Sequence, residues 1–306
     1  MPLEEYLQEL KDPSRPLLAS RLSELSALLP EESRLLSQVW PEAQVARRRQ
    51  ILRRLLDLAE DNVEMNFGAV FMVALNDDDA EARTLAVQGL WEQEDRDVIA
   101  PLIEMLKKDP SPGVRAAVAT VLGSFVLRAE FEQLSEVDSR RVLEALRAAI
   151  DDGDESPEVR GRALESIGAL SASWVRSSID NAHHSGDWRL RVSAVHAMCR
   201  NCDPHWLPVL TEELASDVPE MRFEAAKACA SCCGEVAIPF LGPLLEDDDA
   251  EVQEAAISAL GEIGGNEAKR ALKEIGDHLE PRVREAVAAA LEELEFNEDT
   301  LGFQLS

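Results

Sequence analysis

Aromatic residues are scarce in this sequence: they make up 5% of its 306 residues, and a single one is a tyrosine. Hydrophobic residues nevertheless reach 45%, mostly as alanine, leucine and valine, beside many glutamates and arginines. That composition is typical of α-helices that pack closely through small side chains. We therefore expect an all-α protein with enough apolar side chains for a large core.

Positive charge is also scarce, with 31 lysines and arginines against 59 aspartates and glutamates and a formal net charge of −28. Such a surface repels phosphate backbones and anionic lipids, so we expect neither nucleic acid nor a membrane as a partner. No apolar run approaches the about 18 residues that a membrane span needs, and Met1–Glu5 lacks the basic and apolar regions of a secretory signal. We expect a cytoplasmic protein.

An internal repeat runs through the sequence, in which an acidic or proline-containing turn precedes an apolar residue, an arginine and small apolar residues at helical spacing. The clearest copies are SPGVRAAVATVLGS at 111–124, SPEVRGRALESIGAL at 156–170 and DDDAEVQEAAISALGEIGG at 247–265. The arginine column is Arg83, Arg115, Arg160, Arg191, Arg222, Gln253 and Arg284, at intervals of 32, 45, 31, 31, 31 and 31 residues. Four equal intervals exclude a chance series.

Each copy places its apolar residues on one broad helical stripe, as Val252, Ala256 and Leu260 illustrate. A second helical segment lies between successive copies, set off by Asp, Pro and Gly turn signals. These second segments are Val98–Lys107, Arg141–Asp151, Trp206–Ala215, Ile238–Glu246 and Ala268–Gly276. One repeat is thus a helical hairpin, which buries its apolar face by stacking on its neighbours.

The copies resemble the short HEAT-like repeats first named in phycobilisome lyases, over roughly residues 62–294. The resemblance implies a right-handed α-solenoid, a superhelix of stacked two-helix HEAT-like repeats. It also implies a ladder between the turn acids and the helix arginines of neighbouring repeats, in which Gln253 leaves one rung neutral. The ladder pairs would be Asp109 with Arg115, Asp187 with Arg191, and Asp217 with Arg222.

The two ends of the sequence lack good copies of the repeat. We expect residues 1–60 to form an N-terminal helical cap with helices at Pro16–Leu28 and Glu42–Glu60, and residues 61–294 to hold the repeats in one continuous solenoid domain. The extra residues of the 45-residue interval fall at about 125–138, where they lengthen a helix and add a loop. Residues 295–306 are an acidic and aromatic tail that covers the last repeat or docks on another protein; we favour the cover.

Helical phase predicts which residues face away from the apolar stripe. At about 100° per residue, the second, sixth and ninth positions after the residue before each arginine point to the opposite side and line the concave surface. These positions carry few charges, so they form a small-residue lane in an acidic protein. The predicted partner-binding residues are Thr84, Gln88, Trp91, Val192, His196, Phe223 and Lys227. The alternative is that Trp91 and Phe223 belong to the peripheral core.

The five cysteines form Cys199-x-x-Cys202 and Cys229-x-x-Cys232-Cys233, spacings that resemble a zinc signature. Cys202 and Cys233 hold equivalent repeat positions, and equivalent points on stacked helices lie about 8–10 Å apart, too far for one zinc ion. Cys229 and Cys232 align with apolar residues of the next repeat. We therefore expect reduced structural thiols and no metal. A metal-binding regulator that uses Cys199, Cys202, Cys229 and Cys232 is the weaker alternative.

Arg47, Arg48, Arg49, Arg53 and Arg54 are the one concentration of basic residues. A phosphate or RNA contact is one interpretation. Because the residues between them form an apolar stripe, we expect instead the solvated face of the cap helix, paired with the acidic body.

Motifs of catalysis are missing: we find no glycine-rich phosphate loop, no nucleophile elbow and no paired His–Glu motif like that of HEAT-repeat di-iron hydroxylases. HEAT-like DNA glycosylases use a basic groove, and the small-residue lane of this sequence is not basic. We expect a non-enzymatic scaffold or adaptor, without a cofactor, that binds a protein or extended peptide on the concave face. A bilin or tetrapyrrole lyase subunit, or a related chaperone, is the alternative that fold analogy implies.

Overall fold

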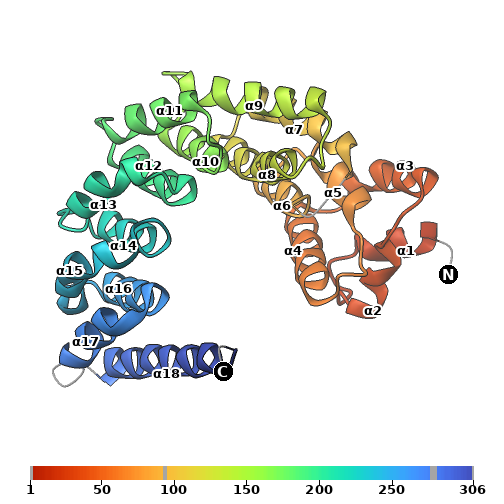
Figure 1. Cartoon of the computed structure of the whole chain (residues 1–306). Helices are drawn as coiled ribbons and strands as arrows, with labels where there is room; N and C mark the ends of the chain where they lie inside the picture. The colour runs from red at the N-terminus through yellow and green to blue at the C-terminus, as the bar shows by residue number, and fades with distance from the viewer. Residues whose placement is uncertain (1–2, 92–94, 276–280, 305–306) are drawn as a thin grey trace. The chain divides into compact units, whose positions relative to one another are not determined.

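The structure is a computed structural model that describes residues 3–91, 95–275 and 281–304. Every regular element in this part of the chain is a helix (Figure 1). The chain divides into two compact units, Met1–Ser166 and Ile167–Ser306. The prediction of an all-α protein is confirmed. That the repeats form one continuous domain stays a prediction.

The first unit begins with short helices and continues as helix pairs (Figure 1). Its elements are α1 (Leu3–Leu10), α2 (Ala19–Leu22), the 3₁₀ helix η1 (Ser23–Leu25), α3 (Pro30–Val39), η2 (Trp40–Glu42), α4 (Val45–Asp61), α5 (Gly68–Ala74), α6 (Ala80–Gln88), η3 (Arg96–Val98), α7 (Ile99–Lys108), α8 (Pro112–Glu130), α9 (Glu136–Asp151) and α10 (Pro157–Ile167). The pairs α5–α6 and α7–α8 are the helical hairpins that the repeat predicts, and α4, α6 and α8 pack on one another in turn.

The second unit repeats the same arrangement of hairpins. Its elements are α11 (Ser173–His183), α12 (Trp188–Asn201), η4 (Pro204–Trp206), α13 (Leu207–Glu213), α14 (Pro219–Cys233), η5 (Gly234–Ala237), α15 (Ile238–Leu241), η6 (Gly242–Glu246), α16 (Ala250–Ile263), α17 (Gly265–Ile275) and α18 (Pro281–Gln304). Helix α12 packs on α14, α14 on α16, and α16 on α18. The second helix of each pair therefore stacks on the second helix of the next, as a solenoid requires.

Local sequence explains where these second helices begin and which side they bury. Asp79, Asp187 and Asp249 cap α6, α12 and α16 by accepting main-chain N–H bonds from the first turn. Proline starts α8, α10 and α14, where its missing N–H would have no helical partner. The apolar stripe is fully buried, as in Val252 and Leu260 of α16. The predicted stripe is thus the core of each unit.

Several predicted segments differ from the observed ones. The cap contains α1 and α3, which the repeat search did not find, and Pro16–Leu28 holds the short α2 and η1. The predicted helix Ile238–Glu246 is divided into α15 and η6. The end of Ala268–Gly276, at Gly276, lies outside the described residues.

The insertion and the C-terminal segment lengthen helices. With the insertion, α8 reaches 19 residues and ends at Glu130, and residues 131–135 connect it to α9. Residues 295–304, which we expected to be a tail, continue α18, because no proline or glycine interrupts the sequence from Arg282 to Leu301. Residues 305–306 lie outside the described part of the chain.

The arginine column forms a ladder that joins successive turns. Arg83 donates through Nε and Nη2 to the two carboxylate oxygens of Asp109, at 2.7 and 2.9 Å, in the turn of the next repeat. Through Nη1 it also donates to the main-chain carbonyl of Asp77, six residues before it. Arg222 makes the same two contacts, with the carboxylate of Asp247 and with the carbonyl six residues before it. Arg83 and Arg222 thus tie their own turns to the following ones.

Three ladder pairs that the resemblance implied are therefore wrong: Asp109–Arg115, Asp187–Arg191 and Asp217–Arg222. Arg115 reaches the main-chain carbonyl of Asp109 and pairs instead with Glu155, at 2.7 and 2.8 Å. Arg191 pairs with Glu213. The turn acid points toward the preceding repeat, so the carboxylate within reach of an arginine is that of the following turn. Gln253, in the place of an arginine, keeps the main-chain contact, because its side-chain amide donates to the carbonyl of Asp247 in its own turn.

The cap contributes a further member of the ladder, Arg48 on α4. Arg48 donates through Nε and Nη2 to the carboxylate of Asp77, at 2.7 and 2.9 Å, and through Nη1 to the carbonyl of Ala43. Trp40 also donates to this carboxylate, which is 1% exposed. Burial alone would raise the pKa of Asp77, but hydrogen bonds from Arg48, Asp79 and Trp40 outweigh it and keep that pKa below its usual range. Helix α4 therefore continues the stack in which the repeats lie.

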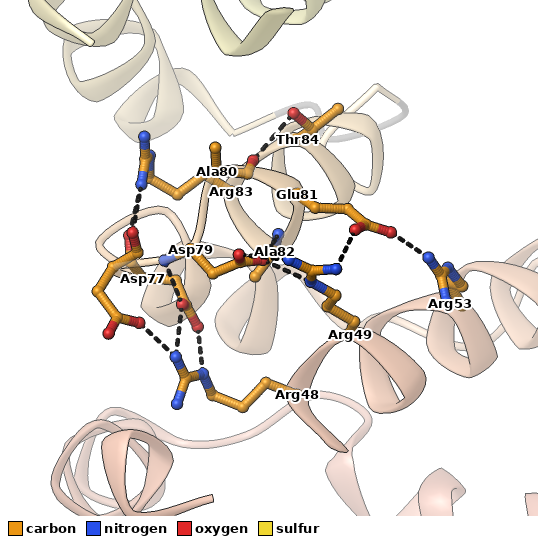
Figure 2. Close-up of polar contacts among 11 residues, drawn as sticks. Arg48, Arg49, Arg53, Asp77, Asp79, Ala80, Glu81, Ala82, Arg83 and Thr84 are labelled. Carbon is orange, nitrogen blue, oxygen red and sulfur yellow. Dashed lines mark hydrogen bonds and ion pairs between the residues drawn. The ribbon is translucent and has the colours of Figure 1, made fainter. Parts of the chain in front are cut away.

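The other arginines of α4 also differ in part from the prediction. Arg47 and Arg48 are buried, and Arg47 donates to a main-chain carbonyl at the end of α1, so a solvated face is wrong for both. Arg49 and Arg53 pair with Asp79 and Glu81 at the start of α6 (Figure 2). The predicted pairing with acidic residues is present. Because carboxylates of this chain hold these guanidinium groups, the cluster is a packing contact.

One stretch of the described chain, Pro219–Glu246, is long and apolar enough to cross a membrane by length and composition, with a mean hydropathy of 1.5 in an 18-residue window. This corrects the expectation that no run approaches that length. The structure divides the stretch into α14, η5, α15 and η6, and Gly234 has a φ of +56° where α14 ends. A core helix of a soluble protein passes the same test, so the finding is weak evidence for a span.

Candidate partner-binding site

Three predicted partner-binding residues, Thr84, Gln88 and Trp91, line one cavity in the unit Met1–Ser166. The cavity has a volume of about 880 Å³, within the range that ligand pockets occupy. Thr84 and Gln88 lie on α6, and α8 contributes Ala116 and Thr120 to the lining. Helical phase therefore brings together residues of two successive repeats.

Aromatic and apolar side chains of the first helices form the rest of the wall. Phe67 and Phe71, at the start of α5 and within it, are fully buried except where they line the cavity, and Met65 lies beside them. Helical phase along the second helix of each repeat does not predict these residues, because they belong to a first helix. The hydrophobic run from Phe67 to Leu75 is the sequence signal that marks them as wall and core.

Trp91 lies beyond the helix on which it was predicted. Helix α6 ends at Gln88, and the N–H of Trp91 donates to the carbonyl of Gln88 at 3.1 Å within the following turn. The indole is 45% exposed and lines the cavity. The helical phase therefore does not apply at this position. The exposure also disagrees with the alternative that Trp91 is peripheral core.

Charge around the cavity is mixed but mainly acidic. Exposed Glu60 and Glu158 contribute two carboxylates, and Arg162 contributes one guanidinium group. Arg162 is also paired with Glu165 at 2.8 Å. The hydroxyl groups of Thr84 and Thr120 donate to carbonyls of their own helices. The rim therefore offers carboxylates to a ligand more readily than positive charge.

The predicted residues of the unit Ile167–Ser306 form a separate cluster on α12 and α14. The ammonium group of Lys227 lies 5.1 Å from the ring centroid of Phe223, and Glu224 contacts His196 at 3.1 Å and Lys227 at 3.7 Å. Val192 is half-buried on α12. Burial raises the pKa of Glu224, but the hydrogen bond and charge of His196 and the charge of Lys227 together lower it. These side chains already bind one another.

Three thiols meet where α12 and α14 end. The Sγ atom of Cys232 lies 2.9 Å from that of Cys202, and both thiols donate to the carbonyl of Cys199. A hydrogen bond from Cys232 lowers the pKa of Cys199 to about 6, aided by Ser231 and by the charge of His196, against the effect of burial. The pKa of Cys232 is raised, first by its hydrogen bond to Cys199 and then by burial.

The separation expected for the equivalent residues Cys202 and Cys233 does not extend to Cys202 and Cys232. Cys202 ends α12 in the left-handed region, with a φ of 48°, and its thiol meets Cys232 rather than the equivalent Cys233. Cys229 is fully buried, as an aligned core residue should be, whereas Cys232 is half-buried. Among the described residues, no group of three or more His, Cys, Asp or Glu side chains is arranged to hold a metal ion.

Comparison with known proteins identifies the family. The sequence matches the family of HEAT repeats at residues 69–168, 175–249 and 207–292. This match covers most of the chain, which therefore belongs to the HEAT-repeat family, as the sequence resemblance predicts. No curated protein matches the sequence.

The structure was also compared with solved structures. YibA of Escherichia coli is similar with a TM-score of 0.53 at 17% identity, over 93% of this chain and 99% of that one. The complex of CpcE and CpcF of phycocyanin lyase from Nostoc has a TM-score of 0.48 at 16% identity, over 74% and 94% of the chains. Human deoxyhypusine hydroxylase has a TM-score of 0.37 at 19% identity, over 96% of each chain. The likeness to YibA shows the fold alone.

Proposed function

We propose that this HEAT-repeat protein is a non-enzymatic scaffold that binds a segment of another protein in the cavity lined by Thr84, Gln88 and Trp91. The observation that carries the proposal is a half-exposed tryptophan that lines a cavity of about 880 Å³ with both apolar and polar walls. Aromatic side chains in such positions contribute a large part of the binding energy in protein interfaces. Repeat proteins expose surfaces of this kind because each repeat needs its core face alone for stacking.

The chemistry of the rim favours a partner segment with an apolar side chain next to a basic one. The apolar side chain would lie against Phe67, Phe71 and Trp91, where it leaves water. A lysine or arginine beside it would meet Glu60 or Glu158. The net charge of −28 would also speed the approach of a basic segment.

The cluster around Glu224 supports a second contact less well. Phe223 and Lys227 contact each other, and Glu224 is held by His196 and Lys227. A partner would have to replace these contacts with new ones at a cost in affinity. We therefore assign the primary contact to the cavity and keep His196, Phe223 and Lys227 as predicted secondary contacts.

A bilin or another tetrapyrrole is the alternative occupant, because the cavity volume also suits a small ligand. Tetrapyrroles carry propionate groups, which Glu60 and Glu158 would repel, and Arg162 is already paired. This charge arrangement favours the basic protein segment. Titration with biliverdin, followed by its visible absorbance, distinguishes the two: a saturable spectral shift that Trp91→Ala abolishes would support the tetrapyrrole.

We also propose that the protein catalyses no reaction and that it binds its partner in the cytoplasm. Its support is the lack of a phosphate loop or nucleophile elbow in the sequence and the absence of a basic groove. Neither cofactor nor metal is part of the proposed function.

The test is a selection of binding peptides from a random displayed library on the full chain, followed by calorimetry. We expect apolar–basic peptides, and we expect Trp91→Ala to weaken them by about 2 kcal/mol or more, about 30-fold in Kd. Trp188→Ala is the matched control, because that indole is also exposed but stacks on Arg189 of α12. Equal affinity of both variants, with unchanged far-ultraviolet circular dichroism, would refute the proposal.

A further inference from the structure

Cys199, Cys202 and Cys232 are three free thiols from two neighbouring repeats: the Sγ atoms of Cys202 and Cys232 lie 2.9 Å apart, and both thiols donate to the main-chain carbonyl of Cys199. Cys199 and Cys202 lie on α12 and at its end, and Cys232 is the second-last residue of α14. Cys202 is exposed, and the other two are half-buried, so small oxidants can reach the cluster. The core packing of the repeats uses Cys229, which is fully buried, and does not require this convergence.

The contacts differentiate the three thiols. Cys232 donates its proton into the cluster, 3.2 Å from the carbonyl of Cys199 and 2.9 Å from the sulfur of Cys202. Its hydrogen bond also stabilises the thiolate of Cys199, whose pKa of about 6 leaves it ionised at neutral pH. A thiolate next to a thiol that can resolve its oxidised form is the arrangement of redox-sensing cysteines.

We propose that Cys199, Cys202 and Cys232 form a thiol redox site that a hydroperoxide oxidises, and that the product is a Cys202–Cys232 disulfide between neighbouring repeats. The thiolate of Cys199 attacks the peroxide, its sulfur is oxidised by two electrons to the sulfenic acid, and the O–O bond breaks. The leaving alkoxide, or hydroxide from hydrogen peroxide, takes a proton from solvent to give an alcohol or water. The Cys232 thiol then attacks the Cys199 sulfur. Its proton and the departing hydroxide leave as water, and a Cys199–Cys232 disulfide remains.

Thiol–disulfide exchange is the last step of the reaction. The Cys202 thiol attacks Cys232, the Cys199–Cys232 bond breaks, Cys199 leaves as the thiolate, and the proton of Cys202 passes to solvent. In sum, two thiols and one hydroperoxide give one disulfide, one alcohol and one water. The link joins the end of α12 to the end of α14 and is independent of the function proposed for the cavity of the first unit.

Peptide mapping of the full chain, oxidised with hydrogen peroxide at pH 7 and analysed without reduction, tests the proposal. Trypsin cleaves after Arg200, so Cys199 and Cys202 leave in separate peptides. We expect the peptide of Cys202 linked to the one that contains Cys232. Cys233→Ser, the matched control, should keep the link. Cys232→Ser should abolish it and leave a sulfenic acid on Cys199 that dimedone traps.

Kinetics test the role of Cys199. The thiolate fraction at pH 7 is about 30-fold larger at a pKa of about 6 than at the usual value of about 8.5, and lower nucleophilicity removes part of this gain. We therefore expect Cys199→Ser to slow link formation several-fold, and the wild-type rate to fall below about pH 6. An unchanged rate, a link that survives Cys232→Ser, or dimedone on another cysteine would overturn the proposal.

A further variant keeps the test valid if Cys232→Ser does not fold. Glycine suits the positive φ of Cys202, so Cys202→Gly should fold and stop at the Cys199–Cys232 disulfide. Circular dichroism checks each variant. Oxidation of Cys202→Gly without any link to the Cys199 peptide would also contradict the proposed sequence.

Discussion

Asp77 joins the cap to the repeats, and a small change in its side chain should lower the free energy of unfolding strongly. Its carboxylate accepts hydrogen bonds from Trp40, from Nε and Nη2 of Arg48 and from the N–H of Asp79, all at 2.7–2.9 Å. The side chains of Asp77 and Arg48 are 1% and 5% exposed. Asp77→Asn keeps the shape, removes the charge and turns an amide NH₂ group toward these donors.

Breaking a buried ion pair by removing one partner costs about 3–5 kcal/mol, because the other charge remains buried. With a slope of about 2 kcal/mol/M in urea, the midpoint of the unit Met1–Ser166 should fall by about 2 M. Urea titration at pH 7, followed by circular dichroism at 222 nm, measures it. The slope should not change, because the same surface is exposed on unfolding.

Two variants control this prediction. Glu104→Gln breaks the exposed pair of Glu104 with Lys108 on α7 and should leave the midpoint within error of the wild type. Adding Arg48→Met to Asp77→Asn removes the unpaired guanidinium, so the double variant should lose less than the sum of the single losses. If Asp77→Asn behaves like Glu104→Gln, the ladder does not stabilise the stack and our account of it is wrong.

Three further predictions concern pH and backbone. Because the pKa of Asp77 is lower in the folded state, its stabilisation is fully present above about pH 4 and is lost as the pH falls through the folded value. The urea-measured gap in unfolding free energy between wild type and Asp77→Asn should be constant from pH 7 to about pH 5 and should narrow below about pH 4, whereas a gap that stays constant or widens there contradicts the sign. Gly89→Ala would place Cβ 2.4 Å from the buried ring of Phe71 and should cost about 1–3 kcal/mol in thermal unfolding. A Cβ at Gly113 would meet only the hydroxyl of Ser111, at an ordinary contact distance of 3.8 Å, so Gly113→Ala should be neutral or stabilising; equal effects would refute the close packing. Cys202→Gly should raise stability by about 1 kcal/mol in reduced protein, since it relieves a left-handed backbone, and a loss would contradict this.

The repeat could be predicted from the sequence because its period and apolar stripe are local. Val252 and Leu260 are buried as their spacing predicts. The ladder partners could not be predicted in the same way. Proximity in sequence favours Asp109 for Arg115, but the reach of an arginine side chain across the stack selects Glu155. A pairing between repeats depends on their stacking geometry, which a period alone does not contain.

The candidate site was found in part. Helical phase placed Thr84 and Gln88 on the cavity, and Trp91 reaches it although α6 has ended. Phe71 was not predicted as a lining residue, because it lies on the first helix of its repeat and its sequence pattern indicates a core residue. The contact between Cys202 and Cys232 depends on the left-handed backbone of Cys202 at the end of α12. A glycine at this position would have indicated that conformation in the sequence, whereas a cysteine does not. Positions near helix ends are therefore where the sequence was least informative.

Photo-crosslinking in living cells of the source organism tests the central claim most directly. Benzoylphenylalanine replaces exposed Gln88 at the cavity or, as the control, exposed Glu144 on α9, outside it. The account predicts a discrete protein adduct from position 88, made through a basic segment of the partner, that disappears when Trp91→Ala is added and does not form from position 144. Adducts that are equal at both positions, or that do not respond to Trp91→Ala, would contradict it.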